Sequence, residues 1–343
     1  MKICHITSFA PNRCGLYEAS RDMAKADILH GKHTVYMVDG RSNENVGKVD
    51  DRNGFKVTVV SPDLIMDCDL IYMHTGIEDR YIVKSQAPII CVVHGKPLDC
   101  FRPESKGEGS SYSLYEYIAQ WPRTKKMLYF WEDYRYYWEH LFFGKDEVFK
   151  YPVIDEDMFN TDCDIYSLKN KGKINVLVCD SIRADIDLFE TAIACINIAK
   201  KFKDVKFHFV GLEQSNLHCW QTILNELSRL GALGDITTRL TNMQSVYRAV
   251  DLVISPNRII NRVVAESLCC GTPVMQETGG ETQIADYFCY MPAPTNVLEI
   301  FGMFVEDFNK GIDKNKIIER SKVFNLQNYY TSVQSMYKEM ELI

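Results

Sequence analysis

One strand, loop and helix in the second half of the chain combine residue types that suit phosphate binding. The strand predicted at Leu252–Ser255 ends in a loop, and a helix is predicted from about Arg262 to Gly271. The first N–H groups of a helix lack an intrahelical acceptor and lie at the positive end of its dipole, so they favour an anion. The amides around Arg262 and Val263 are therefore candidates for binding a diphosphate. Glu266, one turn further, could accept from two ribose hydroxyls; the alternative is a solvated helix carboxylate.

A second candidate follows the strand predicted at Ile174–Cys179. Arg183 lies in the string Asp-Ser-Ile-Arg-Ala-Asp, and its planar guanidinium suits bidentate contact with phosphate. Asp185 is expected to orient Arg183 or to cap the following helix. The alternative is a surface arginine beside a capping aspartate.

Two histidines end predicted strands of the first half. His94 closes one apolar strand and is followed by Gly95 and Lys96, and His74 closes another. A histidine at a strand end can donate to a sugar hydroxyl or to a developing charge, whereas the alternative is a histidine that caps a turn. We expect His94 to act in catalysis, and His74 and Lys96 to contribute to acceptor binding.

The loop Phe9–Gly15 follows the first predicted strand and opens onto a helix. Gly15 permits close approach of the backbone to an anion at the helix start, which makes it a candidate for donor binding. The alternative is an ordinary turn between a strand and a helix. The loop has no complete Gly-x-Gly-x-x-Gly string, so a dinucleotide fingerprint is not supported.

The elements that must position these residues alternate between short apolar strands and helices. The predicted strands are Lys2–Ser8, Thr34–Asp39, Lys56–Val60, Asp69–His74, Ile89–His94, Ile174–Cys179, Lys206–Val210, Ile236–Leu240 and Leu252–Ser255. Such strands, separated by helices, are typical of parallel sheets covered on both faces. The pattern breaks at the polar segment Asp155–Gly172, which predicts domains at residues 1–155 and 170–325 and a terminal helix at 326–343. Ligands bind at the carboxyl ends of such strands, where the candidate residues lie.

Composition and charge limit the function classes. The 343 residues favour two domains, and the formal net charge of −7 argues against a generic polyanion binder. The twelve cysteines include no Cys-x-x-Cys pair, so we expect buried free thiols in a reducing compartment. No apolar run is long enough to cross a bilayer. Four Asp-x-Asp spacings are interpreted as chance or capping, and no metal site is predicted. These features favour a cytoplasmic protein.

The segment Tyr112–Phe143 is dense in aromatic residues, Trp131 among them, with several lysines and arginines between them. Aromatic rings interleaved with cations can stack on sugars or on an extruded base and can hold phosphates. The alternative, which we favour for most of these rings, is the core of the first domain. Trp131 is the candidate for acceptor binding.

The string Ala-Glu-Ser-Leu-Cys-Cys-Gly-Thr-Pro-Val at residues 265–274, followed by Gly279-Gly280, resembles the nucleotide-sugar motif of GT-B glycosyltransferases, in particular the retaining GT4 type. The first strand with Cys14-Gly15, the strand at Gly31–Val38 and the segment Tyr151–Asp155 resemble landmarks of that family in matching order. The resemblance implies two Rossmann-like domains of doubly wound parallel sheets, an interdomain cleft and a C-terminal helix that crosses back to the first domain.

The resemblance also implies roles for individual residues. Glu266 would hold the nucleotide ribose, the Arg262-Val263 amides would meet the diphosphate, His94 would face the donor sugar and Arg183 would neutralise the leaving phosphates. Arg258 stands where the family usually has a glutamate that touches the donor sugar, so it joins His94 and Arg183 as a candidate catalytic residue. Two strings, Asp-Ser-Ile-Arg-Ala-Asp and His-Gly-Lys-Pro, are similar to those of bacteriophage-encoded members.

The function expected from this resemblance is transfer of a sugar from a nucleotide-sugar, with a UDP-sugar favoured, to an acceptor hydroxyl. Configuration would be retained, without a metal ion or other cofactor and without an assigned catalytic base. The acceptor would be a glycan, a small molecule or a hydroxymethylated base in phage DNA, and the protein would lie in the host cytoplasm if it is phage-encoded. Two alternatives stay open: a sugar-nucleotide epimerase or hydrolase of the same fold, and a catalytically inert GT-B protein that binds nucleotide-sugars.

Overall fold

The chain folds into two compact units. Unit 1 comprises Met1–Asp155 together with Phe324–Ile343, and unit 2 comprises Glu156–Val323. The structure is a computed structural model, and it describes residues 1–11, 14–94, 111–130, 135–149, 151–179, 188–211, 217–238, 240–255, 260–276, 289–290 and 297–343. No helix within these ranges is long and apolar enough to cross a membrane.

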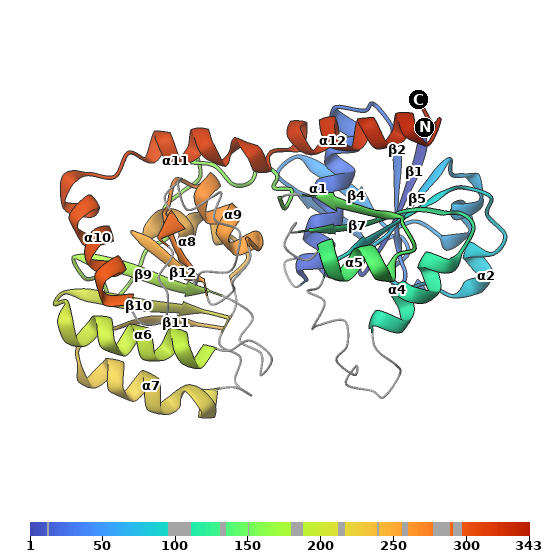
Figure 1. Ribbon diagram of the computed structural model, residues 1–343. Coiled ribbons are helices and arrows are strands. Elements are labelled where there is room, and N and C mark those ends of the chain that lie inside the picture. The colour runs from blue at the N-terminus through green and yellow to red at the C-terminus, as the bar shows by residue number, and fades with distance from the viewer. Residues whose placement is uncertain are drawn as a thin grey trace. The chain divides into compact units, whose positions relative to one another are not determined.

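Unit 1 is built on a six-stranded sheet in the order β2-β1-β5-β6-β7-β8, and each neighbouring pair is parallel (Figure 1). Its strands are β1 (Lys2–Thr7), β2 (Thr34–Asp39), β5 (Leu70–Met73), β6 (Ile89–Val93), β7 (Thr124–Phe130) and β8 (Asp146–Phe149). Its helices are α1 (Gly15–Leu29), α2 (Asp79–Ile82), α4 (Ser111–Gln120), α5 (Arg135–Leu141) and α12 (Leu326–Glu339), with the short 3-10 helices η1 (Asn43–Asn45) and η2 (Pro62–Asp67).

The two faces of this sheet pack against different helices. Alternate residues of β1, β5, β6 and β7, such as Ile6 and Cys91, form one core with Ile118 of α4 and Trp138 of α5. The opposite face carries His5, whose ring lies beside Asp27 of α1. Strands β5 and β6 are buried along their whole length, which explains their continuous apolar runs.

Helix α12, the last helix of the chain, lies against α1 in unit 1 (Figure 1). The hydroxyl of Tyr337 donates to Asp27 Oδ1 at 2.9 Å, and the hydroxyl of Tyr330 lies 3.2 Å from His33 Nε2. Asn325 caps the helix by accepting from the amide of Asn328. The C-terminal helix therefore belongs to the packing of the N-terminal sheet.

The structure corrects one predicted strand of unit 1 and adds two that were not predicted. Lys56–Val60 was predicted as a strand of the parallel sheet, but β3 (Val49–Arg52) and β4 (Phe55–Thr58) form a separate antiparallel hairpin. Strands β7 and β8 were not predicted. Thr124–Phe130 starts with Thr-Lys-Lys, and those polar residues at its amino end masked the buried half that follows.

Unit 2 is built on a second six-stranded parallel sheet, in the order β11-β10-β9-β12-β13-β14. Its strands are β9 (Ile174–Cys179), β10 (Val205–Val210), β11 (Leu233–Thr237), β12 (Leu252–Ser255), β13 (Val274–Gln276) and β14 (Cys289–Tyr290). Its helices are α6 (Leu188–Lys201), α7 (Leu217–Arg229), α8 (Met243–Ala249), α9 (Arg262–Cys269), α10 (Val297–Lys310) and α11 (Lys314–Ser321), followed by the 3-10 helix η5 (Lys322–Phe324).

Each sheet reverses its strand order once. In unit 1 the chain builds outward from β1 to β2 and then crosses to β5, and in unit 2 it builds from β9 to β11 and then crosses to β12. Open α/β sheets bind ligands at the carboxyl ends of the two strands beside such a reversal. The structure therefore directs attention to the residues that follow β1, β5, β9 and β12.

Candidate functional site

Helix α9 begins after β12, beside the reversal point of unit 2. Its N-cap is Asn261, whose side chain accepts from the amide of Val264 at 3.1 Å. The helix ends at Cys269, and Gly271 just beyond it adopts a φ of +76° and donates to Leu268 O, so the predicted stop at Gly271 is confirmed. A Cβ at Gly271 would also lie 3.3 Å from side-chain atoms of α11, which explains the glycine.

Glu266 accepts from two donors, one on the first turn of this helix and one on α8. Arg262 Nε donates to Oε1 and the Tyr247 hydroxyl donates to Oε2, each at 3.1 Å. The side chain of Glu266 is only 11% exposed and that of Arg262 15% exposed. The carboxylate is thus neither a solvated surface group nor mobile, because two donors from different helices fix its plane.

Tyr247 reaches Glu266 from α8 and is itself locked in place. Burial, followed by the negative charge of Glu266, raises the pKa of the Tyr247 hydroxyl well above its ordinary value, so it stays a neutral donor. Thr272 Oγ1 donates to the backbone oxygen of Tyr247 at 2.7 Å, and Ser267 Oγ donates to the backbone oxygen of Thr272. Hydrogen bonds therefore connect α8, α9 and the start of β13 around the carboxylate.

The amides of Arg262 and Val263 are the first two of α9, in the position where the sequence predicts a diphosphate. Five other predicted site residues, Lys96, Trp131, Arg183, Asp185 and Arg258, lie outside the described residues, so their roles stay predictions. Sequence reasoning missed Asn261 and Tyr247. The N-cap was recognisable, because asparagine precedes the helix start, but Tyr247 is nineteen positions from its partner.

Three histidines of unit 1 form a row across neighbouring strands. His5 Nδ1 lies 3.0 Å from His74 Nε2, and His74 Nδ1 lies 2.9 Å from His94 Nε2. At the inner end His5 Nε2 lies 3.3 Å from Asp27 Oδ2. His5, His74 and Asp27 are buried, and only His94, at the end of β6, is partly exposed.

This row places His74 behind His94 rather than at the surface. Burial, followed by the proximity of His94 and His5, lowers the pKa of His74 well below its ordinary value, so this ring is neutral at neutral pH. Both of its ring nitrogens lie within hydrogen-bond distance of another histidine. The predicted contact of His74 with an acceptor is therefore replaced by a contact with His94, which keeps its predicted place at a strand end.

Burial of a neutral His74 makes stability depend on pH. Below about pH 6.5 the unfolded chain takes up a proton that the folded His74 does not, so the free energy of unfolding falls by up to about 1.4 kcal/mol per pH unit for this group. Its contribution is constant above that pH. Chemical denaturation between pH 8 and pH 5 is expected to show a shallower acid loss for His74→Gln than for the unaltered protein. The exposed His140→Gln is the matched control, and equal slopes for the unaltered protein and His74→Gln contradict the prediction.

Gly15 is the first residue of α1 and is exposed. A Cβ at this position would meet no atom within 4 Å, so the fold itself does not require glycine. Cys14 precedes the helix without a side-chain capping bond. Donor binding at the start of α1 stays a prediction.

The aromatic segment divides into core and surface. Among the rings that the structure describes, five are buried in unit 1, which confirms the core interpretation for Tyr115, Tyr129, Phe130, Trp138 and Phe142. On α5, Tyr136 is 70% and Tyr137 55% exposed, and the ring of Tyr136 packs against Tyr137 and His140 at centroid distances of 5.9 and 5.2 Å.

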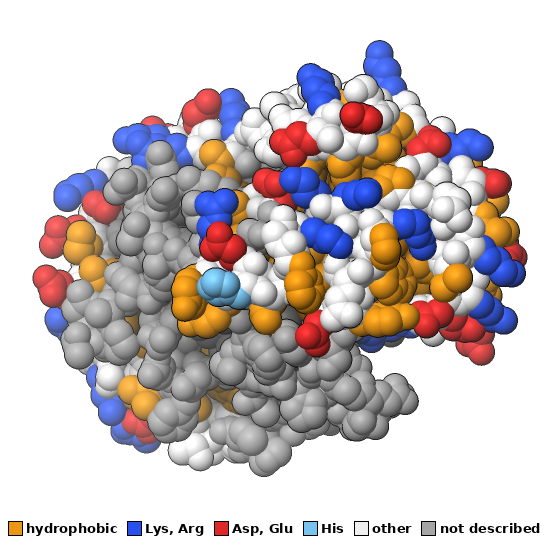
Figure 2. Space-filling model, turned by 45° about the vertical axis from the view of Figure 1, so that its right-hand side comes forward, with side chains coloured by type: hydrophobic (Ala, Val, Ile, Leu, Met, Phe, Trp, Pro, Cys, Tyr) orange, Lys and Arg blue, Asp and Glu red, His pale blue; other side chains and the backbone are white. Residues whose placement is uncertain are grey.

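Figure 2 shows basic (blue) and acidic (red) side chains interspersed on the face it presents, with hydrophobic side chains between them.

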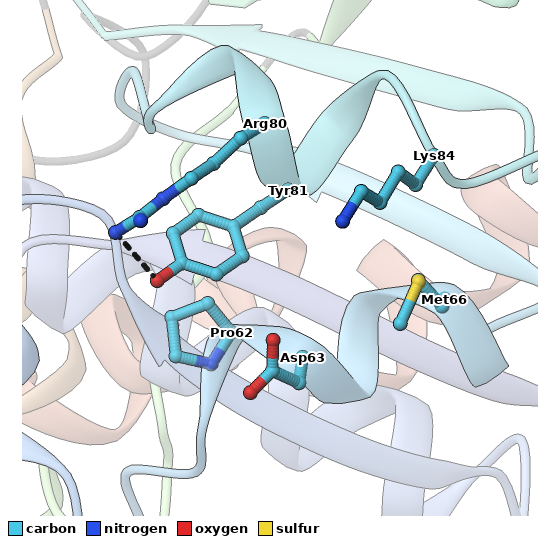
Figure 3. Close-up of a pocket in the computed structure, with 6 residues that line it drawn as sticks. All are labelled: Pro62, Asp63, Met66, Arg80, Tyr81 and Lys84. Atoms are coloured by element: carbon cyan, nitrogen blue, oxygen red, sulfur yellow. Dashed lines mark hydrogen bonds between the residues drawn. The ribbon is translucent and has the colours of Figure 1, made fainter.

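A small pocket lies between η2 and α2 of unit 1 (Figure 3). It is lined by Pro62, Asp63, Met66, Arg80, Tyr81 and Lys84. Its volume of about 180 Å³ is below the roughly 300–1,000 Å³ typical of small-molecule sites. The Arg80 guanidinium is paired with Glu78 and lies over the Tyr81 ring. No predicted site residue lines this pocket, and it does not enter the proposed site.

Two units with six-stranded parallel sheets, each with a reversal point beside a candidate residue, define the GT-B fold. The solved structures that it resembles include glycosyltransferases. HepE of Anabaena in complex with UDP superimposes with a TM-score of 0.68 at 15% identity, covering 99% of this chain and 100% of that chain. Sucrose-phosphate synthase from Thermosynechococcus elongatus gives 0.70 at 11% identity, covering 99% of both chains.

A third similar structure is an alpha-glucosyltransferase in complex with UDP and a 13-mer DNA containing an HMU base, with a TM-score of 0.66 at 12% identity over 97% of this chain and 98% of that chain. No protein-family model matches the sequence, and the comparison with curated proteins gives no match. At such low identities the likeness shows the fold, and function must be argued from the site.

Proposed function

We propose that this chain is a glycosyltransferase that transfers a sugar from a nucleotide-sugar, with a UDP-sugar favoured, to an acceptor hydroxyl. The observation that carries the proposal is Glu266, a carboxylate fixed by Arg262 and Tyr247 beside the reversal point of a GT-B donor-side sheet. A fixed carboxylate can accept from the two hydroxyls of a ribose. HepE and the alpha-glucosyltransferase were both found with UDP, which supports uracil as the base of the donor nucleotide.

The chemistry follows from the charge that develops when the anomeric bond breaks. Negative charge grows on the diphosphate and the sugar gains oxocarbenium character. Amides at the start of α9, aided by the helix dipole, would stabilise that charge without reorganisation, and Arg183 would add a full positive charge. We therefore propose a reaction that needs no metal ion and retains configuration, with His94 and Arg258 at the donor sugar and no residue assigned as base.

The acceptor is proposed to bind unit 1. Tyr136, Tyr137 and His140 form an exposed aromatic group on α5, with Arg135 exposed beside them. Such a surface can stack on a sugar ring or on a base and can hold a phosphate. We propose Lys96 and Trp131 as further contacts. A glycan, a small molecule or a hydroxymethylated DNA base fits this chemistry, the last supported by the DNA bound to the alpha-glucosyltransferase. We propose a cytoplasmic location, in a host cell if the chain is phage-encoded.

A nucleotide screen tests the donor assignment. UDP and UDP-sugars are expected to raise the unfolding temperature more than GDP-, ADP- or free sugars, because a ligand at 100-fold excess over its Kd stabilises the folded state by about 2.7 kcal/mol. The measurement is thermal unfolding of the full chain with each ligand. If no nucleotide or nucleotide-sugar shifts the transition, the donor-site assignment fails.

The same ligands distinguish the proposed transferase from its alternatives. With the stabilising nucleotide-sugar, transfer to a carbohydrate or to DNA carrying hydroxymethylated bases supports a transferase, and unmodified DNA is the matched control. Release of free nucleotide, or conversion of the sugar, in the absence of any acceptor indicates a hydrolase or epimerase. Binding without turnover under all conditions indicates an inert nucleotide-sugar-binding protein.

A further inference from the structure

The row of His5, His74 and His94 runs diagonally across the strands of the sheet in unit 1. His5 of β1 pairs in register with Tyr72 of β5, which pairs with Ile90 of β6. His74 lies two positions beyond Tyr72 and His94 lies four positions beyond Ile90. Because side chains alternate between faces with a period of two, His5, His74 and His94 share one face. Each step moves one strand across and two residues toward the carboxyl ends.

The inner end of the row is a carboxylate with a fixed environment. Asp27 Oδ1 accepts from the Tyr337 hydroxyl at 2.9 Å, and the Tyr72 hydroxyl lies 2.7 Å from that of Tyr337. Burial, followed by the negative charge of Asp27, raises the pKa of Tyr337 well above its ordinary value, so Tyr337 remains a donor. The His5 ring also stacks on Tyr72, with centroids 4.7 Å apart and planes 5° apart. These contacts hold His5 and Asp27 in one orientation.

A carboxylate can only accept hydrogen bonds, and a neutral imidazole has one donor and one acceptor nitrogen. As a neutral ring, His5 donates through Nε2 to Asp27, which makes its Nδ1 an acceptor for His74 Nε2–H. By the same rule His74 Nδ1 accepts from His94 Nε2–H. Every hydrogen bond of the row then runs from donor to acceptor toward Asp27. The tautomer of His94 is therefore set by Asp27, three hydrogen bonds away.

We propose that Asp27, His5 and His74 are positioning residues that fix His94 as the Nε2–H tautomer, so that Nδ1 of His94 serves as an acceptor toward a substrate hydroxyl. A carboxylate that sets the tautomer of an imidazole is an established device in catalysis, and here it acts through two intervening rings. The substrate part of this inference rests on the proposed function. The tautomer part stands on the hydrogen-bond geometry of unit 1 alone.

Asp27→Asn is expected to reverse the donor-to-acceptor direction of each hydrogen bond between the histidines. Tyr337 keeps its acceptor by bonding the amide oxygen of Asn, which turns the amide NH₂ toward His5 Nε2. His5 would then carry its proton on Nδ1, and so would His74 and His94 in turn. Tyr337→Phe is the matched control, because it removes a hydroxyl at Asp27 but keeps the carboxylate, and the original direction is expected to survive.

Two-bond ¹H–¹⁵N spectra of histidine-labelled protein distinguish the two tautomers without any substrate. The chain has only eight histidines, and His5→Gln, His74→Gln and His94→Gln assign the signals. The expected result is Nε2–H at His94 in the unaltered protein and in Tyr337→Phe, and Nδ1–H in Asp27→Asn. An Nδ1–H tautomer of His94 in the unaltered protein, or no change in folded Asp27→Asn, overturns the proposal.

A kinetic readout separates this inference from the proposed function. With a donor and acceptor identified as above, kcat/KM of Asp27→Asn is expected to fall roughly 10- to 100-fold, as is common for residues that orient a first contact. Donor affinity at Glu266 is expected to stay unchanged. If no nucleotide-sugar binds at all, the proposed function fails while the tautomer result remains valid. If transfer occurs and Asp27→Asn transfers at the full rate, the positioning role is wrong.

Discussion

Replacing Glu266 with alanine is expected to weaken UDP binding by roughly 100- to 10,000-fold. Hydrogen bonds to a charged acceptor contribute about 1.5–3 kcal/mol each, and the proposed site has two ribose hydroxyls that donate to this one carboxylate. Arg262 and Tyr247 fix the carboxylate before a ligand arrives, so little affinity is lost to ordering it. Calorimetric titration of the unaltered and variant proteins with UDP measures the difference.

The nucleotide itself supplies the control for a change in fold. In the unaltered protein 2′-deoxy-UDP is expected to bind more weakly than UDP, because one donor to Glu266 is missing. In Glu266→Ala the two nucleotides are expected to bind equally. Tyr247→Phe keeps the carboxylate and removes one of its donors, so it is expected to cost only several-fold in UDP affinity. A Glu266→Ala protein that still prefers UDP over its deoxy form would remove the ribose role.

The fold was predictable from the sequence wherever a strand is buried along its whole length, because burial of both faces produces an unbroken apolar run. Strands such as Ile89–Val93 and Ile174–Cys179 are buried along their length, so they appear as unbroken apolar runs. The limits of α9 were predictable because Gly271 requires a positive φ that ends a helix. The hairpin β3–β4 was misassigned because the strand period was evident in Phe55–Thr58, while its pairing partner Val49–Arg52 has two aspartates and no apolar run.

The candidate site was predictable only in part. Glu266 was found because a local string surrounds it, and its burial confirms that it is not a solvated surface carboxylate. One of the two donors that orient it, Tyr247, comes from a different helix, nineteen positions away in the chain. His5 and Asp27 were missed, although a histidine inside the apolar run of β1 and an aspartate on the buried face of α1 each require a buried partner. What the sequence does not contain is the register that makes His5, His74 and Asp27 neighbours.

A second cluster of buried charged side chains connects Asp155, at the end of the N-terminal segment, to α1. Asp155, the last residue of that segment, accepts from Lys25 Nζ at 2.6 Å and from Arg21 Nη1 at 3.3 Å. Asp155 and Arg21 have no exposed surface, and Lys25 has almost none. Arg21 is also close to Asp50, at 3.4 Å, and its Nη2 donates to the backbone oxygen of Arg52. Two buried cations on one helix therefore share the single carboxylate of Asp155.

Asp155→Asn is expected to reduce the free energy of unfolding by about 3–5 kcal/mol, because it leaves the charge of Lys25 buried without its closest counter-charge. That is a large part of the roughly 5–15 kcal/mol by which folded domains are stable. Chemical denaturation followed by circular dichroism measures the loss. Glu78→Gln is the matched control, since Glu78 pairs with Arg80 on the surface of the same unit, and its loss is expected to stay below about 1 kcal/mol.

The origin of the loss is tested by removing both charges of the closest pair. If burial of an uncompensated cation causes the destabilisation, Lys25→Met combined with Asp155→Asn is expected to be more stable than the sum of the two single changes predicts, by about 1–3 kcal/mol. Arg21 retains Asp50 and Asp22 as counter-charges in that double variant. Strict additivity of the two changes would mean that Asp155 acts through backbone packing at the end of unit 1 rather than through its charge. A loss for Asp155→Asn no larger than that for Glu78→Gln would contradict the burial argument itself.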